Sequence, residues 1–249
     1  MLPVPESSAH VEAAKAGVPV TEQYDVVVVG GGTAGTMAAL AAARQGALVC
    51  LVEAGGFVGG TCLALGNALP FHNSRGEVVI GGLPQELVER MVQAGGAAPG
   101  GHLPNTAGIG GSFTPFDPEV LKRVLFELLT EAGVVLKLHT QCFDVCLSDR
   151  RVTGVRVLDK AGVSEVAAQV LVDATGDADL AACAGAPLTQ DAPIEALNAT
   201  LLFRVAAVDT QAFCDDVRQH PERITQLADP YLREVRGLSA EGILARSVR

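Results

Sequence analysis

The residues with the clearest chemical meaning are three glycines near position 30. Gly30, Gly32 and Gly35 form the pattern GxGxxG. The first glycine permits a tight turn, the second lets the backbone approach a phosphate, and the third lets a helix pack closely on a strand. The N–H groups of Thr33 and Ala34, at the start of such a helix, favour an anion. The pattern predicts a phosphate-binding loop, with a tight ligand-free turn as the alternative.

A single carboxylate follows this loop at an informative distance. Glu53 ends the next apolar stretch and is followed by Ala54. Its separation from Gly30 is close to the ~20 residues that separate a dinucleotide loop from its ribose-binding acid. A carboxylate there accepts hydrogen bonds from both ribose hydroxyls and repels a 2′-phosphate. The pair of features predicts a dinucleotide site.

The elements that must position these residues form a βαβ unit. Residues 25–29 are an unbroken apolar run, typical of a buried strand, and residues 33–45 are rich in alanine, which favours a helix. Gly46 ends this helix, and residues 47–53 form a second buried strand. This order predicts two parallel strands joined by a right-handed crossover.

The pattern downstream predicts two more helices and a meander. We expect a helix over 83–94 with Pro84 in its first turn, a long loop over 95–114, and a helix over 117–132 that Asp117 caps. Strands are expected over 134–139, 143–147, 152–159, 163–172 and 198–205, of which the second to fourth read as an antiparallel meander. The tail over 209–249 reads as polar and mostly helical.

Later motifs indicate which dinucleotide the loop binds. The stretch 25–62 resembles the opening of FAD-dependent oxidoreductases related to glutathione reductase and to the flavoprotein subunit of fumarate reductase. The turn 59–61 resembles the second Gly-rich turn of that family, and the strand end 170–177 resembles its "ATG" segment. The resemblance implies an α/β, Rossmann-like FAD-binding domain with a parallel central sheet, an inserted antiparallel β-meander and a partial substrate domain.

The resemblance also implies which residues hold FAD. The segment after the strand 134–139 lies where relatives hold adenine through backbone atoms, which adds Cys142. The expected cofactor-binding set is Gly30, Gly32, Thr33, Ala34, Gly35, Glu53, Ala54, Gly59, Gly60, Thr61, Cys142, Ala174, Thr175, Gly176 and Asp177.

One departure from the family excludes a reaction. In the disulfide reductases a second redox cysteine stands five positions after the first. Here Cys62 is followed at that distance by Asn67. Without a dithiol relay, we exclude a disulfide reductase. Cys62 either lies near the flavin or is a small packed residue.

Candidate reacting groups follow the second Gly-rich turn. His72 suits proton transfer near neutral pH, and Arg75 suits a substrate carboxylate. His102, in the expected long loop, is a further candidate. Arg204, in an apolar stretch, reads as a substrate anchor or an edge residue. A structural or surface role is the alternative for each.

The expected function is an FAD-dependent oxidoreductase that transfers hydride between flavin and a small organic metabolite, such as an organic acid. The alternatives are an FAD- or ADP-binding chain that needs a partner chain for catalysis, and an NAD-dependent dehydrogenase. We expect a flexible leader over 1–21, the FAD-binding domain over 22–185, in which 62–116 faces flavin and substrate, and the start of an incomplete substrate domain over 186–249.

Composition restricts the partners and the cellular compartment that we expect for this chain. The net charge of −10 argues against nucleic-acid binding, and no apolar stretch predicts membrane insertion. Six scattered cysteines without a CxxC pattern predict reduced thiols in the cytoplasm. No metal site is expected, because N-capping explains Asp177 beside Asp173 and Asp179. A homo-oligomer or a complementary chain is an expected partner.

Overall fold

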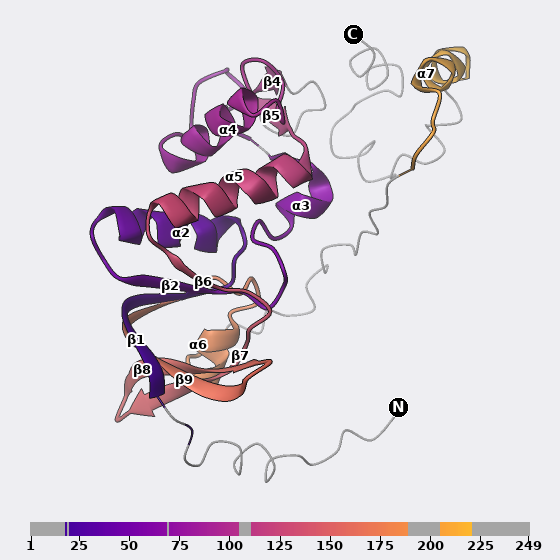
Figure 1. Cartoon of the computed structure of the whole chain (residues 1–249). Helices are drawn as coiled ribbons and strands as arrows, with labels where there is room; N and C mark the ends of the chain where they lie inside the picture. Colours follow the sequence, from indigo (N-terminus) through magenta and orange to yellow (C-terminus); the bar gives the residue numbers. More distant parts are fainter. Residues whose placement is uncertain (1–17, 19, 69, 105–110, 189–204, 221–249) are drawn as a thin grey trace, which may run out of the picture.

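A six-stranded sheet forms the centre of the molecule, in the order β6-β2-β1-β9-β8-β7. The computed structural model describes residues 18, 20–68, 70–104, 111–188 and 205–220. The elements in chain order (Figure 1) are β1 Val20–Val29, α2 Thr33–Arg44, β2 Val49–Val52, α3 Cys62–Leu65, β3 Asn67–Ala68, α4 Leu83–Gln93, β4 Leu103–Pro104, β5 Ser112–Pro115, α5 Pro118–Glu131, β6 Val135–Lys137, β7 Gln141–Ser148, β8 Arg151–Asp159, β9 Gly162–Asp173, α6 Asp179–Cys183 and α7 Thr210–Gln219.

Four of these strands are parallel, in the spatial order β6-β2-β1-β9. This is the third, second, first and fourth parallel strand along the chain, which is the strand order of a Rossmann-type half. The predicted βαβ unit and the predicted α/β class with a parallel central sheet are therefore confirmed. The antiparallel meander is confirmed as well, because β7 pairs with β8 and β8 with β9.

The uninterrupted apolar runs arise because the parallel strands are buried on both faces. Along β1, Val28 belongs to the core under the helices, whereas Val27 and Val29 belong to the core on the meander side. Along β2, Leu51 belongs to the core under the helices and Cys50 to the core on the meander side. Successive side chains of a strand point to opposite faces, so a strand with two cores needs an apolar residue at each position.

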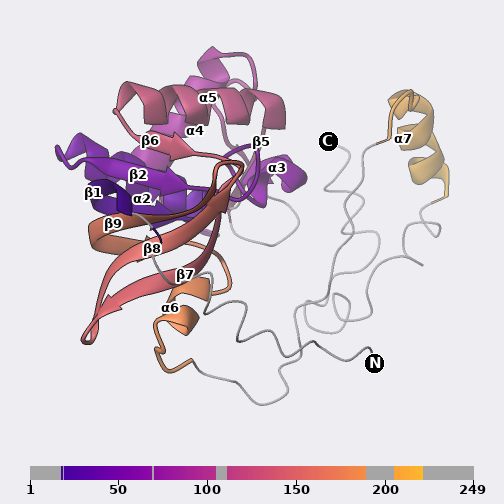
Figure 2. The same ribbon diagram turned by 60° about the horizontal axis from the view of Figure 1, so that its bottom comes forward.

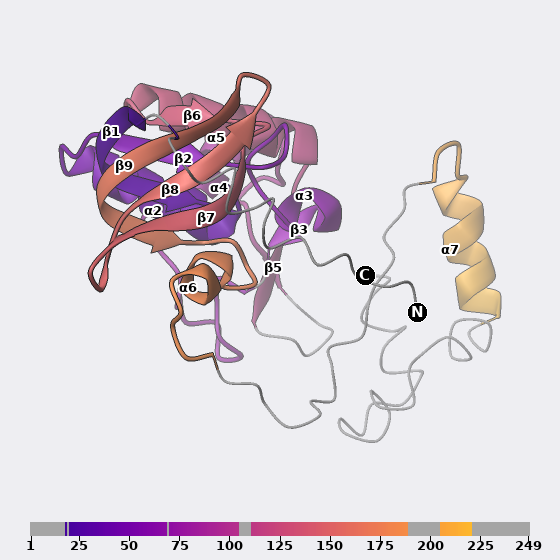
Figure 3. The same ribbon diagram turned by 90° about the horizontal axis from the view of Figure 1, so that it is seen from below.

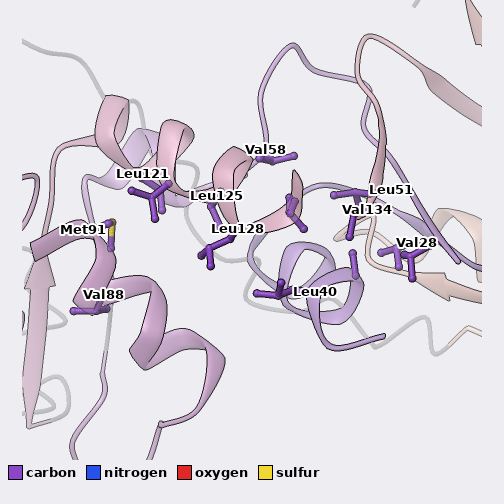
Figure 4. Close-up of a cluster of buried hydrophobic side chains, with 14 of the residues drawn as sticks. Val28, Leu40, Leu51, Val58, Val88, Met91, Leu121, Leu125, Leu128 and Val134 are labelled. Carbon is purple, nitrogen blue, oxygen red and sulfur yellow. The ribbon is translucent and has the colours of Figure 1, made fainter. Parts of the chain in front are cut away.

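Helices and meander cover opposite faces of the parallel strands. Figure 1 shows α2 and α5 directly above β2 and β6, with α4 beyond them, and β7–β9 with α6 below; Figure 2 shows the same layers after rotation. Leu40 of α2 and Leu128 of α5 meet the sheet residues Val28 and Leu51 in the larger core (Figure 4). This core fixes the start of α2 relative to the ends of the strands.

Local signals place the helix ends where the sequence predicts them. Asp117 caps α5, because its Oδ1 accepts a hydrogen bond from Glu119 N–H at 2.8 Å, and Pro118 is the first helical residue. Pro84 lies in the first turn of α4. Gly46, after α2, has a φ of +89°, a left-handed conformation that glycine adopts without strain.

The long loop expected over 95–114 is partly wrong. β4 and β5 lie within or at the end of this range and join β3 in a second sheet, in the order β3-β5-β4 (β3 and β5 are seen from below in Figure 3). β3 and β4 have two residues each, too few for a periodic pattern. Their pairing depends on β5, which is distant from β3 in the sequence.

Three expectations fall wholly or mostly outside the described residues. They are the leader over 1–21, the strand over 198–205 with Arg204, and the part of the helical tail beyond α7. In the part of the chain that the structure describes, no helix combines the length and the apolarity that crossing a membrane requires.

Candidate nucleotide-binding site

The GxGxxG loop lies where the strand order of the parallel sheet reverses. The chain leaves β1 toward β2 on one side, and β9 lies on the other side of β1. Open α/β sheets bind ligands in the crevice outside the carboxyl ends of the strands at such a switch point. Gly30 follows β1 and Ala174 follows β9, and Ala174 N–H donates to Val29 O at 2.8 Å. Both predicted turns therefore meet at this crevice.

Two glycines of the loop are required by close packing. Gly30 has a φ of +102°, and a Cβ there would lie 2.2 Å from the backbone oxygen of Ala174. A Cβ on Gly35 would lie 1.8 Å from the backbone oxygen of Gly30. Side chains at either place would push the helix and the "ATG" turn away from the loop, so both glycines serve the predicted structural roles.

Gly32 differs from its neighbours because open space lies where its side chain would be. A Cβ on Gly32 would have no atom within 4 Å, and Gly32 is the N-cap of α2 with extended backbone and no side-chain cap. Thr33 and Ala34, in the exposed first turn, follow it. Since no packing explains this glycine, the open space beside the helix N-terminus is the feature that a bound phosphate would use.

The second Gly-rich turn touches the first. Gly59 N–H donates to Gly31 O at 2.7 Å, and a Cβ on Gly60 would lie 2.8 Å from Gly32 Cα. Thr61 then leads into α3. The sequence predicts this neighbourhood only through the resemblance, and the backbone contact places the two turns together.

Glu53 points back at the loop. Its Oε2 accepts from Gly31 N–H and its Oε1 from Gly55 N–H, each at 2.6 Å. Each carboxylate oxygen can accept more than one hydrogen bond, so the carboxylate can still accept from hydroxyl groups. The side chain is half-buried, and Ala54 beside it is exposed. This arrangement suits the ribose role predicted for Glu53.

Asp173 organises the "ATG" turn, and the N-cap predicted for Asp177 is wrong. α6 begins after Ala178, which has a left-handed φ of +61° and no side-chain cap. Asp173 instead accepts from Thr175 N–H at 3.1 Å through Oδ1 and from Ala181 N–H at 3.0 Å through Oδ2. Desolvation raises the pKa of Asp173, but these hydrogen bonds outweigh it and lower the pKa. A carboxylate at the end of β9, well before the helix, therefore takes the capping role.

The segment after β6 contacts the backbone around Glu53. Thr140 N–H donates to Glu53 O and His139 N–H to Gly55 O, both at 3.0 Å. Cys142 follows in β7 and is half-buried, and its burial raises the pKa of the thiol to about 11. A protonated thiol of this kind is unreactive, so backbone contact is the role that remains for Cys142 at the site.

Cys62 lies between the loop and a cavity. Its Sγ is 3.3 Å from Thr33 Oγ1, at the start of α2. Both residues line a cavity of about 360 Å³ that extends between α2, α4 and α5. Cys62 therefore packs in the cavity wall and also borders the phosphate loop, so its position is compatible with both alternatives, a flavin neighbour and a packed residue.

The histidines lie next to Phe71, which lines this cavity, but neither histidine lines it: the rings of His102 and Phe71 are 4.4 Å apart, and His72 follows Phe71 in the chain. His72 Nδ1 is 2.9 Å from Ser112 Oγ, and His102 Nδ1 is 2.7 Å from Thr114 Oγ1. The two rings are 5.2 Å apart, edge to face. Burial lowers the pKa of His102, and the electrostatic effect of the neighbouring His72 lowers it further.

Sequence reasoning missed Ser112 and Thr114. Ser112 Oγ accepts from His72 N–H at 3.1 Å and from Phe71 N–H at 3.2 Å, which fixes the backbone at His72. Their alternation in β5, with both side chains buried, is a weak signal within a four-residue strand. Arg75, by contrast, is exposed in the turn that Asn73 Oδ1 holds.

Fold and site together define a nucleotide-binding domain of the Rossmann type. The chain belongs to the FAD dependent oxidoreductase family, whose model matches residues 25–241. The cofactor of this family is FAD. The glycine loop, with open space beside Gly32, fits that cofactor.

Individual relatives are similar over short stretches. The chain is 46% identical over 48 residues to glutathione reductase of Schizosaccharomyces pombe (strain 972 / ATCC 24843) and 52% identical over 48 residues to dihydrolipoyl dehydrogenase of Trypanosoma brucei brucei. Each match covers 19% of this chain and 10% of the relative, so the chain spans about a tenth of the curated relatives it matches. The open conformation of a flavocytochrome c3 fumarate reductase is 21% identical, with a TM-score of 0.47, over 70% of this chain and 39% of that one.

Proposed function

We propose that the chain holds the ADP half of FAD at the switch point between β1 and β9 and exchanges hydride with a small organic metabolite there. The observation that carries this proposal is the meeting of three turns, in which Gly59 N–H donates to Gly31 O and Ala174 lies against Gly30. The bound cofactor supplies the hydride chemistry, and the chain has to bind and orient it and its substrate.

The proposed contacts divide between backbone and one acid. The N-terminus of α2, at Gly32 to Gly35, would hold the diphosphate through N–H groups and the helix dipole. Glu53 would accept the ribose hydroxyls, and backbone near Cys142 would lie against adenine. The turns 59–61 and 174–177 would complete the site.

His72 is the proposed proton-transfer group. Ser112 Oγ accepts two backbone N–H groups, which leaves its hydroxyl hydrogen for His72 Nδ1. In this tautomer the other ring nitrogen, Nε2, carries the proton. Arg75, which is exposed, is the proposed anchor only if the substrate carries an anionic group. We also propose that 22–185 is the cofactor-binding domain and that 186–249 belongs to a substrate domain.

A charge at Gly32 tests the proposal without weakening the fold. In Gly32→Asp, the new side chain enters open space and provides an N-cap for α2, and Asp is among the best N-caps. The same carboxylate would repel a diphosphate. We expect the FAD content, measured by flavin absorbance against protein concentration, to fall about tenfold or more, while the melting temperature of the cofactor-free protein stays equal or rises.

Gly81→Asp is the matched control. As at Gly32, a Cβ at Gly81 would have no atom within 4 Å, and Gly81 is exposed. It lies in the segment between β3 and α4 and belongs to none of the three turns. This variant should retain the full FAD content. Normal FAD content in Gly32→Asp would overturn the assignment of the phosphate site.

A further inference from the structure

The cavity beside the phosphate loop lies inside the helical layer. Its volume is about 360 Å³, within the range of small-molecule sites. Figure 4 shows Val88 and Met91 of α4 facing Leu121 and Leu125 of α5 around it. These four residues belong to the main core, so the cavity is part of the core, and Gly59 is among its other lining residues.

The wall of the cavity contains no charged side chain among the described residues. Its polar residues are Thr33, Thr36, Cys62 and Asn67. Thr36 Oγ1 already donates to Gly32 O at 2.9 Å, and Thr33 pairs with Cys62. The rest of the wall is apolar, apart from the backbone of Gly59.

This wall disfavours an ionised ligand. Moving a carboxylate from water into an apolar site without a cation or several donors costs several kcal/mol. Arg75, the expected carboxylate anchor, is exposed and does not line the cavity. Met37 and Met91, which do line it, have flexible and polarisable side chains that adapt to apolar shapes.

We propose that this cavity receives the substrate and that the substrate is an uncharged, mainly apolar molecule. The proposal rests on the proposed function, because the cavity borders Gly59 and Cys62 of the turn assigned to the cofactor. It replaces the small organic acid expected from the sequence with a neutral compound, and it leaves Asn67 as the polar contact for a carbonyl or hydroxyl group of that compound.

Two fluorescent probes that differ by one charge test the proposal on the FAD-loaded protein. N-phenyl-1-naphthylamine is neutral, and 8-anilinonaphthalene-1-sulfonate is its sulfonated counterpart. We expect the neutral probe to bind about tenfold tighter or more in a fluorescence titration. Equal affinities, or tighter binding of the sulfonate, would overturn the proposal, and this comparison requires no variant.

A filling substitution locates the binding. Ala68, in β3, lines the cavity, so Ala68→Phe places a ring inside it. Ala64, on the exposed side of α3, does not line the cavity, so Ala64→Phe is the matched control. We expect Ala68→Phe to weaken the neutral probe about tenfold or more, with FAD content unchanged, and Ala64→Phe to match the wild type.

The outcomes separate this proposal from the one on which it rests. If Ala68→Phe lowers FAD content together with probe binding, the cavity belongs to the cofactor and the substrate assignment is wrong. Unchanged probe binding in Ala68→Phe would also contradict the assignment of this cavity as the substrate site. Absence of FAD from the wild type contradicts the proposed function instead, and that result is read from flavin absorbance before any probe is added.

Discussion

At the scale of single residues, the site depends on backbone N–H groups and one carboxylate. The turns 30–35, 53–61 and 174–177 contain no lysine or arginine. Within these turns, the charge of a diphosphate would be met by the N-terminus of α2 and by N–H groups. In the proposed site Glu53, held by Gly31 and Gly55, would add selectivity because a 2′-phosphate beside it would be repelled.

His102 gives the protein a pH-dependent stability. Burial and the adjacent His72 lower its pKa from the ordinary 6.5. In the unfolded chain His102 takes up a proton as the pH falls through 6.5, whereas the folded protein takes it up only at lower pH. The unfolded state then binds more protons, so His102 makes the free energy of unfolding decrease as the pH falls below 6.5.

The matching variant is His102→Gln, which keeps a hydrogen-bonding side chain but does not titrate. Urea unfolding between pH 7 and the lowered pKa should show a smaller loss of stability in the variant than in the wild type. An identical pH dependence in the two proteins would mean that the pKa of His102 is not shifted.

At the scale of elements, α5 holds the helical layer on the sheet and forms one wall of the cavity. Its start depends on Asp117, which caps Glu119 N–H. We expect Asp117→Ala to lower the free energy of unfolding by about 1 kcal/mol, measured by urea denaturation. Asp117→Ser, which can still cap, should recover most of this loss, and no difference between the two variants would contradict the capping role.

Sequence patterns predict the elements that have strong local signals. The parallel strands are predictable because two buried faces demand continuous apolar runs, and α5 because Asp117-Pro118 is a local start signal. The β3-β5-β4 sheet is not, since its strands are short and pair at long range. The capping of α6 by Asp173 also escapes prediction, because it depends on the left-handed turn at Ala178.

The same distinction applies to the site. The contact between the glycine loop and Glu53 is predictable because it follows from spacing within one βαβ unit. The cavity is not, because α2, α4, α5 and β3 each contribute part of its wall. Ser112 becomes meaningful only when β5 places it beside His72. The catalytic roles of His72 and Arg75 stay predictions.

At the scale of the whole molecule, β9 joins the two layers. Its length of 12 residues lets it pair with β8 in the meander and with β1 in the parallel sheet. The "ATG" turn at its end is thereby fixed beside Gly30. The central claim is that this junction binds the ADP half of FAD, so affinity should depend on adenosine and diphosphate more than on flavin.

Competition binding on the cofactor-free protein tests this claim most directly. The protein is titrated with FAD while flavin fluorescence is followed, and then ADP or FMN is added as competitor. The account predicts that ADP displaces FAD and that FMN, which lacks the adenosine and the second phosphate, binds at least about tenfold more weakly than FAD. Displacement by FMN as effective as by ADP, or no competition by ADP, would contradict it.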